Sequence, residues 1–234
     1  YLLGVNLASI QHQLVNKRVR CPVDLAAALL SQACLGLHAA HEACDASGRP
    51  LEIVHRDCTP SNIMVLPTGD VKLIDFGVAR SLGTRAWSDG GAFVGKVAYA
   101  APEQISQPHA IDRRADLFAA GVIFYELLAG RPLFARETDY STMSAVMQDP
   151  VPPVAGVSAD VNALLQRLLA RNPSERLASA ASLAAELEQI VLKSGGHYLQ
   201  RRNIALSLRR FGVCLDGPVP RSLSGRPTVF PPIG

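Results

Sequence analysis

Hydrophobic residues along the chain are grouped in long runs that indicate buried helices. The stretch from Leu25 to about Cys44 is rich in Ala and Leu and apolar on most faces. We therefore expect a buried helix there, capped by Asp24. A second run, from Asp116 to Ala129, is apolar nearly all round and is followed by Gly130. Because glycine often follows the last residue of a helix, this run predicts a central core helix.

The rest of the pattern predicts one hairpin and further helices. Two strand-like segments, at 62–66 and 71–74, flank a Pro-Thr-Gly-Asp turn at 67–70, which is typical of a β-hairpin. Helical structure is expected to resume at Pro102, after a Gly- and Ser-rich loop. Recurring apolar positions indicate two later helices, one with Leu164, Leu165, Leu168 and Leu169, and a last one with Leu183, Leu187, Ile190 and Val191. The expected fold class is mainly α with a small β-hairpin.

The C-terminal part of the chain has a different composition. Beyond Ser194-Gly195-Gly196 the hydrophobic pattern weakens, and five prolines lie between Pro218 and Pro232. We therefore expect a folded domain over residues 1–193 and a linker or disordered tail over residues 194–234.

Composition narrows the class of protein. The 234 residues are 48% hydrophobic and 18% charged, which fits a soluble globular domain with one sizeable core. A net charge of +3 with scattered basic residues gives no support for nucleic-acid binding. No membrane segment is expected, because no apolar run approaches the ~20 residues of a spanning helix. The five cysteines lack metal-ligand spacing and are interpreted as reduced thiols of a cytoplasmic protein.

Three short motifs carry the candidate chemistry. His55-Arg56-Asp57 is followed by Asn62, then by Asp75-Phe76-Gly77, then by Ala101-Pro102-Glu103. Each tripeptide alone is weak, but their order, with a short hairpin between the first two, is specific. Asp57 is placed to orient a substrate hydroxyl and accept its proton, while Asn62 and Asp75 offer oxygen ligands for Mg²⁺. The motifs together predict phosphoryl transfer from ATP.

The motifs resemble those of eukaryotic-type Ser/Thr protein kinases, in particular the bacterial members. The resemblance runs from Tyr1 to about Lys193 and is carried by residues 55–63, 95–104, 116–130 and 171–176. The resemblance implies that the chain comprises the hinge and the C-terminal lobe of a kinase. The N-terminal lobe, which precedes the hinge in this family, is missing from the sequence. No glycine-rich loop and no strand lysine with a glutamate partner occur in the sequence. The chain is therefore interpreted as a fragment whose N-terminal lobe lies upstream, and is expected to be inactive alone.

The resemblance also implies roles for the residues around these motifs. His55 and Phe76 correspond to residues that pack in an apolar column rather than react. Arg56 corresponds to the arginine that pairs with a phosphorylated activation loop, for which Thr84 and Ser88 are the candidate acceptors. A surface loop with incidental hydroxyls is the alternative for that segment.

Other corresponding positions concern structure and nucleotide binding. Glu103 and Arg176 resemble a buried ion pair, and Asp116 resembles the aspartate that hydrogen-bonds the backbone of the catalytic loop. The resemblance also implies nucleotide contacts. The backbone of Leu2 would pair with adenine, and Asn6 would contact the ribose. Leu7 and Met64 would form an apolar wall under the adenine, and Asp75 would contact the phosphates through the metal.

One pair of positions departs from the family pattern. Most Ser/Thr kinases have Lys two residues after the catalytic Asp and Thr after the glycine that precedes the Ala-Pro-Glu stretch. Here these positions hold Thr59 and Lys96. We expect the exchange to be compensatory, with Lys96 supplying the cation that Thr59 lacks. Two independent changes in an enzyme with weakened activity are the alternative.

Two other functions remain open from the sequence. A pseudokinase or scaffold would bind a partner without transfer, but such a module has no need for Asp57, Asn62 and Asp75 together. A small-molecule phosphotransferase is disfavoured by Ala101-Pro102-Glu103 and the long activation segment, which serve protein substrates. Pro60 and Ser61 resemble the Ser/Thr rather than the tyrosine class.

Overall fold

The computed structural model describes residues 3–75, 96–107 and 111–215. Within these ranges the chain forms three short strands, eight α-helices and four 3-10 turns. The strands are β1 (Val5–Asn6), β2 (Ile63–Val65) and β3 (Val71–Leu73). The helices are α1 (Leu7–Asn16), α2 (Val23–His41), α3 (Pro102–Ser106), α4 (Arg114–Ala129), α5 (Asp139–Gln148), α6 (Ala159–Leu168), α7 (Ala180–Lys193) and α8 (Arg201–Arg210).

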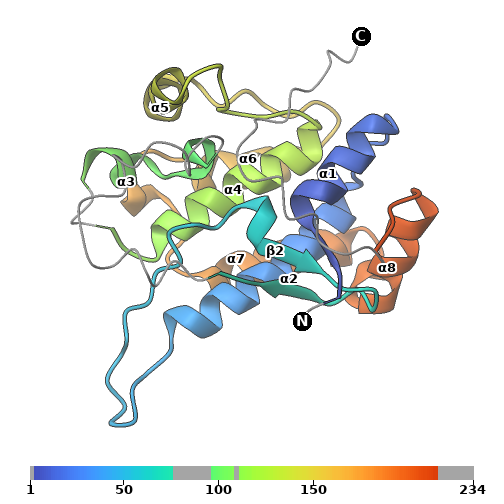
Figure 1. Ribbon diagram of the computed structural model, residues 1–234, viewed down its shortest axis with the longest axis horizontal. Coiled ribbons are helices and arrows are strands. Elements are labelled where there is room, and N and C mark those ends of the chain that lie inside the picture. The colour runs from blue at the N-terminus through green and yellow to red at the C-terminus, as the bar shows by residue number, and fades with distance from the viewer. Residues whose placement is uncertain (1–2, 76–95, 108–110, 216–234) are drawn as a thin grey trace.

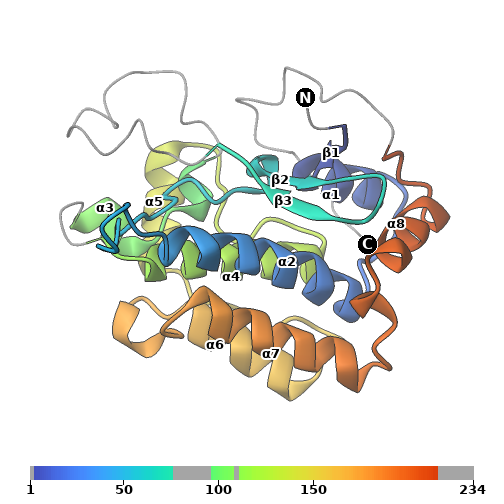
Figure 2. The same cartoon turned by 90° about the horizontal axis from the view of Figure 1, so that it is seen from below.

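The elements are stacked in layers, with the sheet on one side of the central helices. Figure 2 shows the hairpin above α2 and α4, and α6 and α7 beneath them; the contacts of α2 with α7, α4 and β3 fix this order. All three strands are antiparallel, in the order β1-β2-β3. The prediction of a helix-rich fold with one small hairpin is confirmed.

Helix α4 forms the centre of the core, as its sequence predicts. From Ala115 to Leu128 every residue is buried. The helix ends at Gly130, whose φ of 66° is left-handed and suits a residue without a Cβ. Because α4 contacts neighbours on all sides, any polar group along it has to find a partner inside the protein.

Helix α2 differs from the prediction at both ends. Its N-cap is Pro22, and Asp24 lies in the first turn. There the Asp24 carboxylate accepts a hydrogen bond from the Leu25 N–H (3.0 Å), and its negative charge is stabilised by the positive end of the helix dipole. The helix stops at His41 because the chain then turns into a loop closed by a bridge between Cys44 and Pro50. The predicted cap and the predicted end at Cys44 were therefore wrong.

By length and apolar composition, α2 is the one helix among residues 3–75, 96–107 and 111–215 that would reach across a bilayer. This corrects the expectation that no apolar run is long enough. However, 56% of its apolar window is buried inside the protein, where it packs between α4 and α7. Such burial is typical of a core helix.

The prediction of a linker or disordered tail starting at residue 194 was wrong for its first part. A 3-10 turn (His197–Leu199) and α8 follow α7, and α8 buries three residues, Ile204, Ala205 and Leu208. The error arose because α8 carries four arginines and little apolar sequence, so its single buried stripe gave a weak pattern. Residues 216–234, with the prolines, lie outside the described residues.

Candidate active site

The loop that carries His55-Arg56-Asp57 is held from below by helix α4. Asp116 accepts hydrogen bonds from the backbone N–H groups of His55 (to Oδ2, 2.9 Å) and Arg56 (to Oδ1, 2.9 Å). Its Oδ2 also contacts Nε2 of His41 at 2.8 Å, with both side chains almost fully buried. The predicted contact of Asp116 with this loop is therefore present, whereas the part played by His41 was missed.

The backbone at Arg56 is in an unfavourable conformation. Its φ is 62°, in the left-handed region that a residue with a side chain rarely adopts. Asp116 fixes the N–H of Arg56, and the amide of Gln104 on α3 donates to its carbonyl (3.2 Å). Such conformations persist only where the surroundings enforce them, and they cluster at functional sites.

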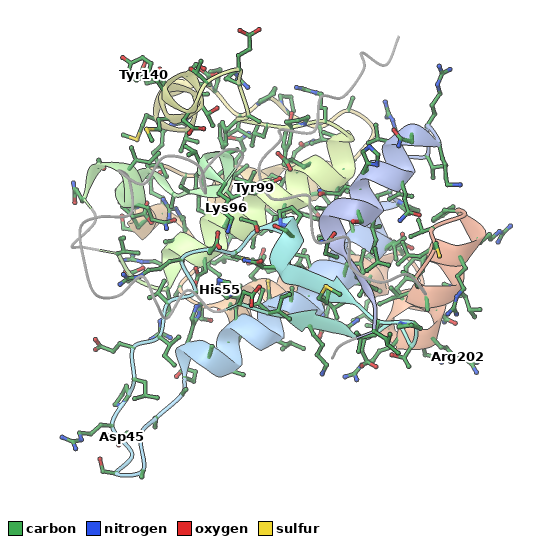
Figure 3. All side chains as sticks on the ribbon, viewed as in Figure 1. Asp45, His55, Lys96, Tyr99, Tyr140 and Arg202 are labelled. Carbon is green, nitrogen blue, oxygen red and sulfur yellow. The ribbon has the colours of Figure 1, made fainter. Side chains whose placement is uncertain are left out.

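The carboxylate of Asp57 is held by two side chains. The Nζ of Lys96 lies 2.6 Å from Asp57 Oδ2, and the amide nitrogen of Asn62 donates to Asp57 O (2.8 Å) and Oδ2 (3.3 Å). The side chain of Asp57 is 13% exposed and that of Lys96 33% exposed. Asn62 of the same loop and Lys96 of a later segment thus meet at one partly accessible carboxylate. Figure 3 shows Lys96 and His55 in the same central region of the molecule.

The hairpin brings Asn62 and Asp75 to its open end. Asn62 directly precedes β2, and the N–H of Ile74, after β3, donates to Asn62 O (2.9 Å). His55 is fully buried, and its Nε2 lies 3.2 Å from Ile74 O, which joins the hairpin to the catalytic loop. Asp75 is exposed and has a left-handed φ of 54°. It is the second strained residue of this site.

The residues present fit a Mg²⁺ ion. Because Asn62 directs its amide nitrogen at Asp57, the amide oxygen is left to face the other way. Asp75 adds an exposed carboxylate at the neighbouring hairpin end. Mg²⁺ binds through few protein oxygens together with water and phosphate. Among the described residues, no three His, Cys, Asp or Glu side chains form a metal-binding cluster.

Thr59 and Lys96 take different positions at this site. Thr59 is buried, and its hydroxyl lies 2.9 Å from the hydroxyl of Ser61. Lys96 immediately precedes a 3-10 turn (Val97–Tyr99) and reaches Asp57 from there. The ammonium group of Lys96 thus lies at the Asp57 carboxylate, whereas Thr59 does not supply a cation there.

The segment after Lys96 is anchored by a buried ion pair. Glu103 and Arg176 form two parallel contacts, Oε1 to Nη1 at 2.6 Å and Oε2 to Nη2 at 2.8 Å. Arg176 also donates to the carbonyls of Ala170, Arg114 and Arg171, so its charge is well satisfied. The resemblance to protein kinases predicted this ion pair.

A second anchor of this segment was not anticipated. The hydroxyl of Tyr99 donates to Glu126 Oε2 on α4 (2.7 Å), and the N–H of Leu133 donates to Glu126 Oε1 (3.2 Å). Burial raises the pKa of Glu126 to about 7, and the two hydrogen bonds oppose this only in part. The sequence feature that could have indicated this anchor is Glu126 itself, a charged residue within the otherwise apolar sequence of α4.

Three of the candidate nucleotide residues, Leu7, Met64 and Asn6, are buried. Leu7 is fully buried within the hydrophobic core, so it was wrongly assigned to the adenine wall. Met64 on β2 is also buried. Asn6 is the N-cap of α1, where its side chain accepts a hydrogen bond from the Ser9 N–H at 2.8 Å. Its ribose contact stays a prediction.

Four further candidates lie outside the described residues: Leu2, Phe76, Thr84 and Ser88.

Together, the helical layers, the hairpin and the anchored loop define the C-terminal lobe of a protein-kinase fold. Residues 4–187 match the family model described as the protein kinase domain. The chain therefore belongs to the protein kinase family.

Curated relatives with similar sequences are bacterial. The chain is 35% identical over 192 residues to the tyrosine-protein kinase MasK of Myxococcus xanthus, a match that covers 80% of this chain and 30% of that protein. It is 37% identical over 173 residues to a probable serine/threonine-protein kinase of Corynebacterium efficiens, covering 70% and 25%. With the serine/threonine-protein kinase PknB of Mycobacterium tuberculosis it shares 34% over 196 residues, covering 81% and 29%. The chain thus spans less than a third of the length of these relatives.

Proposed function

We propose that the complete protein transfers the γ-phosphoryl group of Mg-ATP to a serine or threonine hydroxyl of a protein. The observation that carries this proposal is the Asp57 carboxylate, held by Lys96 at 2.6 Å and by the Asn62 amide. Asp75 adds a carboxylate at the end of the same hairpin. A binding module would have no physical reason to orient all four groups together. Residue 57 stands where the family has its catalytic base.

Each residue has a separate task in this reaction. Asp57 accepts a hydrogen bond from the substrate hydroxyl, aligns it and takes its proton as the new bond forms. Asn62 keeps Asp57 oriented and, with Asp75, would hold Mg²⁺. When bound, the metal neutralises charge on the phosphate oxygens. The described residues therefore serve positioning and electrostatics, which supply most of the rate in phosphoryl transfer.

Lys96 is proposed to supply the cation that the family carries at the position of Thr59. Its ammonium group already contacts Asp57, beside the place where negative charge develops. In the complete protein, Lys96→Ala should lower kcat by about 10²–10³. Lys72, exposed on β3, provides the matched control. The exchange Thr59→Lys with Lys96→Thr should restore part of the rate. Unchanged turnover in Lys96→Ala would contradict compensation.

The type of acceptor hydroxyl requires its own measurement. One relative carries the name of a tyrosine kinase and two carry serine/threonine names. We favour Ser/Thr from Pro60 and Ser61. Phosphoamino-acid analysis of a protein substrate after transfer distinguishes the two classes, and phosphotyrosine alone would overturn the assignment.

The kinase proposal is tested with the complete protein and the Asp75→Asn variant. Asp75 is exposed, so the change should leave the fold intact and abolish Mg-ATP-dependent phosphorylation. Asp160→Asn, in the exposed first turn of α6, is a control for the loss of one carboxylate away from the hairpin. A parent protein without transfer, or a variant as active as the parent, would refute the proposal.

Two expectations accompany it. The 234 residues alone should show no turnover, because they hold no glycine-rich loop or strand lysine to position the phosphates. We also propose a cytoplasmic location, since all five cysteines carry free thiols, as expected in a reducing compartment.

A further inference from the structure

The turn of the β2–β3 hairpin touches the first turn of α8 without intervening side chains. Gly69 has a φ of +89°, and a Cβ added to it would lie 1.8 Å from the carbonyl oxygen of Arg201. No other residue type fits there unless α8 moves. Figures 1 and 2 both show α8 beside the hairpin turn. This close approach joins two segments 132 positions apart in number, from 69 to 201.

Polar contacts reinforce the same junction. The Nη1 of Arg201 lies 2.5 Å from Asp70 Oδ1, and the hydroxyl of Thr68 donates to Asp70 Oδ2 at 2.7 Å. On the opposite side of the turn, Gln32 of α2 accepts a hydrogen bond from the Val71 N–H at 3.2 Å. The turn is therefore held between α2 and α8.

The segment that includes α8 contacts the hairpin at one end and α1 at the other. Residues 197–215, which we name the C-terminal strap, bury Ile204, Leu208 and Leu215 completely and Val213 nearly so. At the far end, the N–H of Cys214 donates to the side chain of Gln13 on α1 at 3.0 Å. The C-terminal strap is thus a packed part of the lobe, although the match to the family model ends at residue 187.

The hairpin connects the C-terminal strap with the catalytic site. Its turn is closed by the Leu66 N–H, which donates to Asp70 O (2.8 Å), and the ladder pairs Val65 with Val71 and Ile63 with Leu73. At the other end lies the hydrogen bond between Ile74 and Asn62. Together with β1, the hairpin forms a sheet whose strands are only two or three residues long, and so small a sheet depends for its placement on outside contacts.

We propose that the C-terminal strap is a positioning element for the metal site, acting through the hairpin on Asn62 and Asp75. This inference rests on the proposed kinase function. Gly69 and Arg201 are positioning residues: neither reaches the site, and both determine where the hairpin sits. Loss of the strap contact should weaken Mg²⁺ binding, as changes to outer-shell supports of metal ligands do.

The first test uses Gly69→Ala in the complete protein, with Gly156→Ala as the matched control. Gly156 has a similar φ of +83° but open space around it, so it reports the backbone strain alone. We expect Gly69→Ala to raise the Mg²⁺ concentration for half-maximal activity about tenfold. Hydrogen exchange of the hairpin amides should also accelerate. Gly156→Ala should change neither.

The second test reverses the ion pair. Arg201→Asp places two carboxylates together without harming α8, because an acidic residue suits a helix N-terminus. The pair is partly exposed, so we expect hairpin amide exchange to rise only about twofold to fivefold. Asp70→Arg combined with Arg201→Asp should restore the parent value. Arg202→Asp, on the outer side of α8 in Figure 3, is the control.

The outcomes separate this inference from the kinase proposal. Hairpin exchange in Gly69→Ala and Arg201→Asp that equals their controls would overturn the strap proposal, whatever the activity. Faster hairpin exchange with an unchanged Mg²⁺ requirement would equally overturn it, because the strap would then not position the metal ligands. If the parent protein transfers no phosphate, the kinase proposal fails. In that case weaker Mg²⁺ binding in Gly69→Ala than in Gly156→Ala, measured by calorimetry with the metal alone, still supports the strap, and equal binding overturns it.

Discussion

Two consecutive loops of this chain, residues 42–52 and 53–62, are held in opposite ways. In the first, Asp45 accepts hydrogen bonds from Ser47 and Arg49, so the loop is tied mostly to itself. In the second, Arg56 is bound by α4 and α3, and His55 lies next to the hairpin. Figure 1 shows the first loop extending away from the body, and Figure 3 places Asp45 at its tip.

The comparison shows what fixes a strained backbone in place. Glu52 and Arg56 both have left-handed φ values, of 49° and 62°. Only Arg56 has its N–H and C=O fixed by side chains distant in sequence. Exposed loops tolerate such residues as turns, whereas a catalytic loop needs contacts from several elements to hold its functional groups.

The largest effect is expected when the anchor below the catalytic loop is removed. Asp116→Ala leaves two backbone N–H groups and the His41 ring without an acceptor. We expect the free energy of unfolding of the 234-residue chain to fall by about 3–5 kcal/mol. Asp45→Ala, in the first loop, should produce only a small fraction of this change. Urea unfolding measures both, and equal losses would remove the distinction between the loops.

A smaller effect concerns pH and the same helix. The folded-state pKa of Glu126 is raised from 4.5 to about 7, so the folded protein holds this proton more tightly than the unfolded chain. The contribution of protonated Glu126 to the free energy of unfolding is fully present below the unfolded-state pKa and is lost as the pH rises through the folded-state pKa of about 7. Relative to Glu126→Gln, the parent should therefore lose stability between about pH 5 and pH 8, by at most about 3 kcal/mol.

Urea unfolding of both proteins at the two pH values gives this difference directly. The Gln variant can still accept from Leu133 and pair with Tyr99, which makes it a conservative replacement. A parent that gains stability relative to the variant as the pH rises would show that Glu126 is not held protonated by burial.

The smallest effect should come from the contact on the other side of Arg56. Gln104 accepts a hydrogen bond from the Ala101 N–H at 2.9 Å and donates to Arg56 O. Gln104→Ala should lower the free energy of unfolding by about 1 kcal/mol. Hydrogen exchange should accelerate in residues 54–58 and stay unchanged in 42–52. Faster exchange in both loops would show that they are not independent.

The sequence predicted the parts of the site that depend on short motifs. The catalytic loop, the hairpin, the core helix ending at Gly130 and the pairing of Glu103 with Arg176 could be inferred, because each has a local pattern or a family counterpart. His41 could not, because its partner Asp116 lies 75 positions away and the residue itself looks like the end of an apolar helix.

Leu7 and the C-terminal strap show two further limits. The resemblance to protein kinases places Leu7 beside the nucleotide, but only packing shows that its side chain is enclosed by the core. The strap was missed because four arginines outweigh a short buried stripe in α8. In both places tertiary contacts decide what a local pattern leaves open.

The central claim is that Asp57 is the catalytic base of a protein kinase, and one measurement tests it directly. Transfer of labelled phosphate from Mg-ATP to a protein substrate is compared between the complete parent protein and Asp57→Asn. Asparagine keeps the shape and the neighbours of Asp57 but cannot take the proton, so kcat should fall by about 10²–10⁴ with little change in KM for ATP. A variant that transfers phosphate at the parent rate would contradict the account.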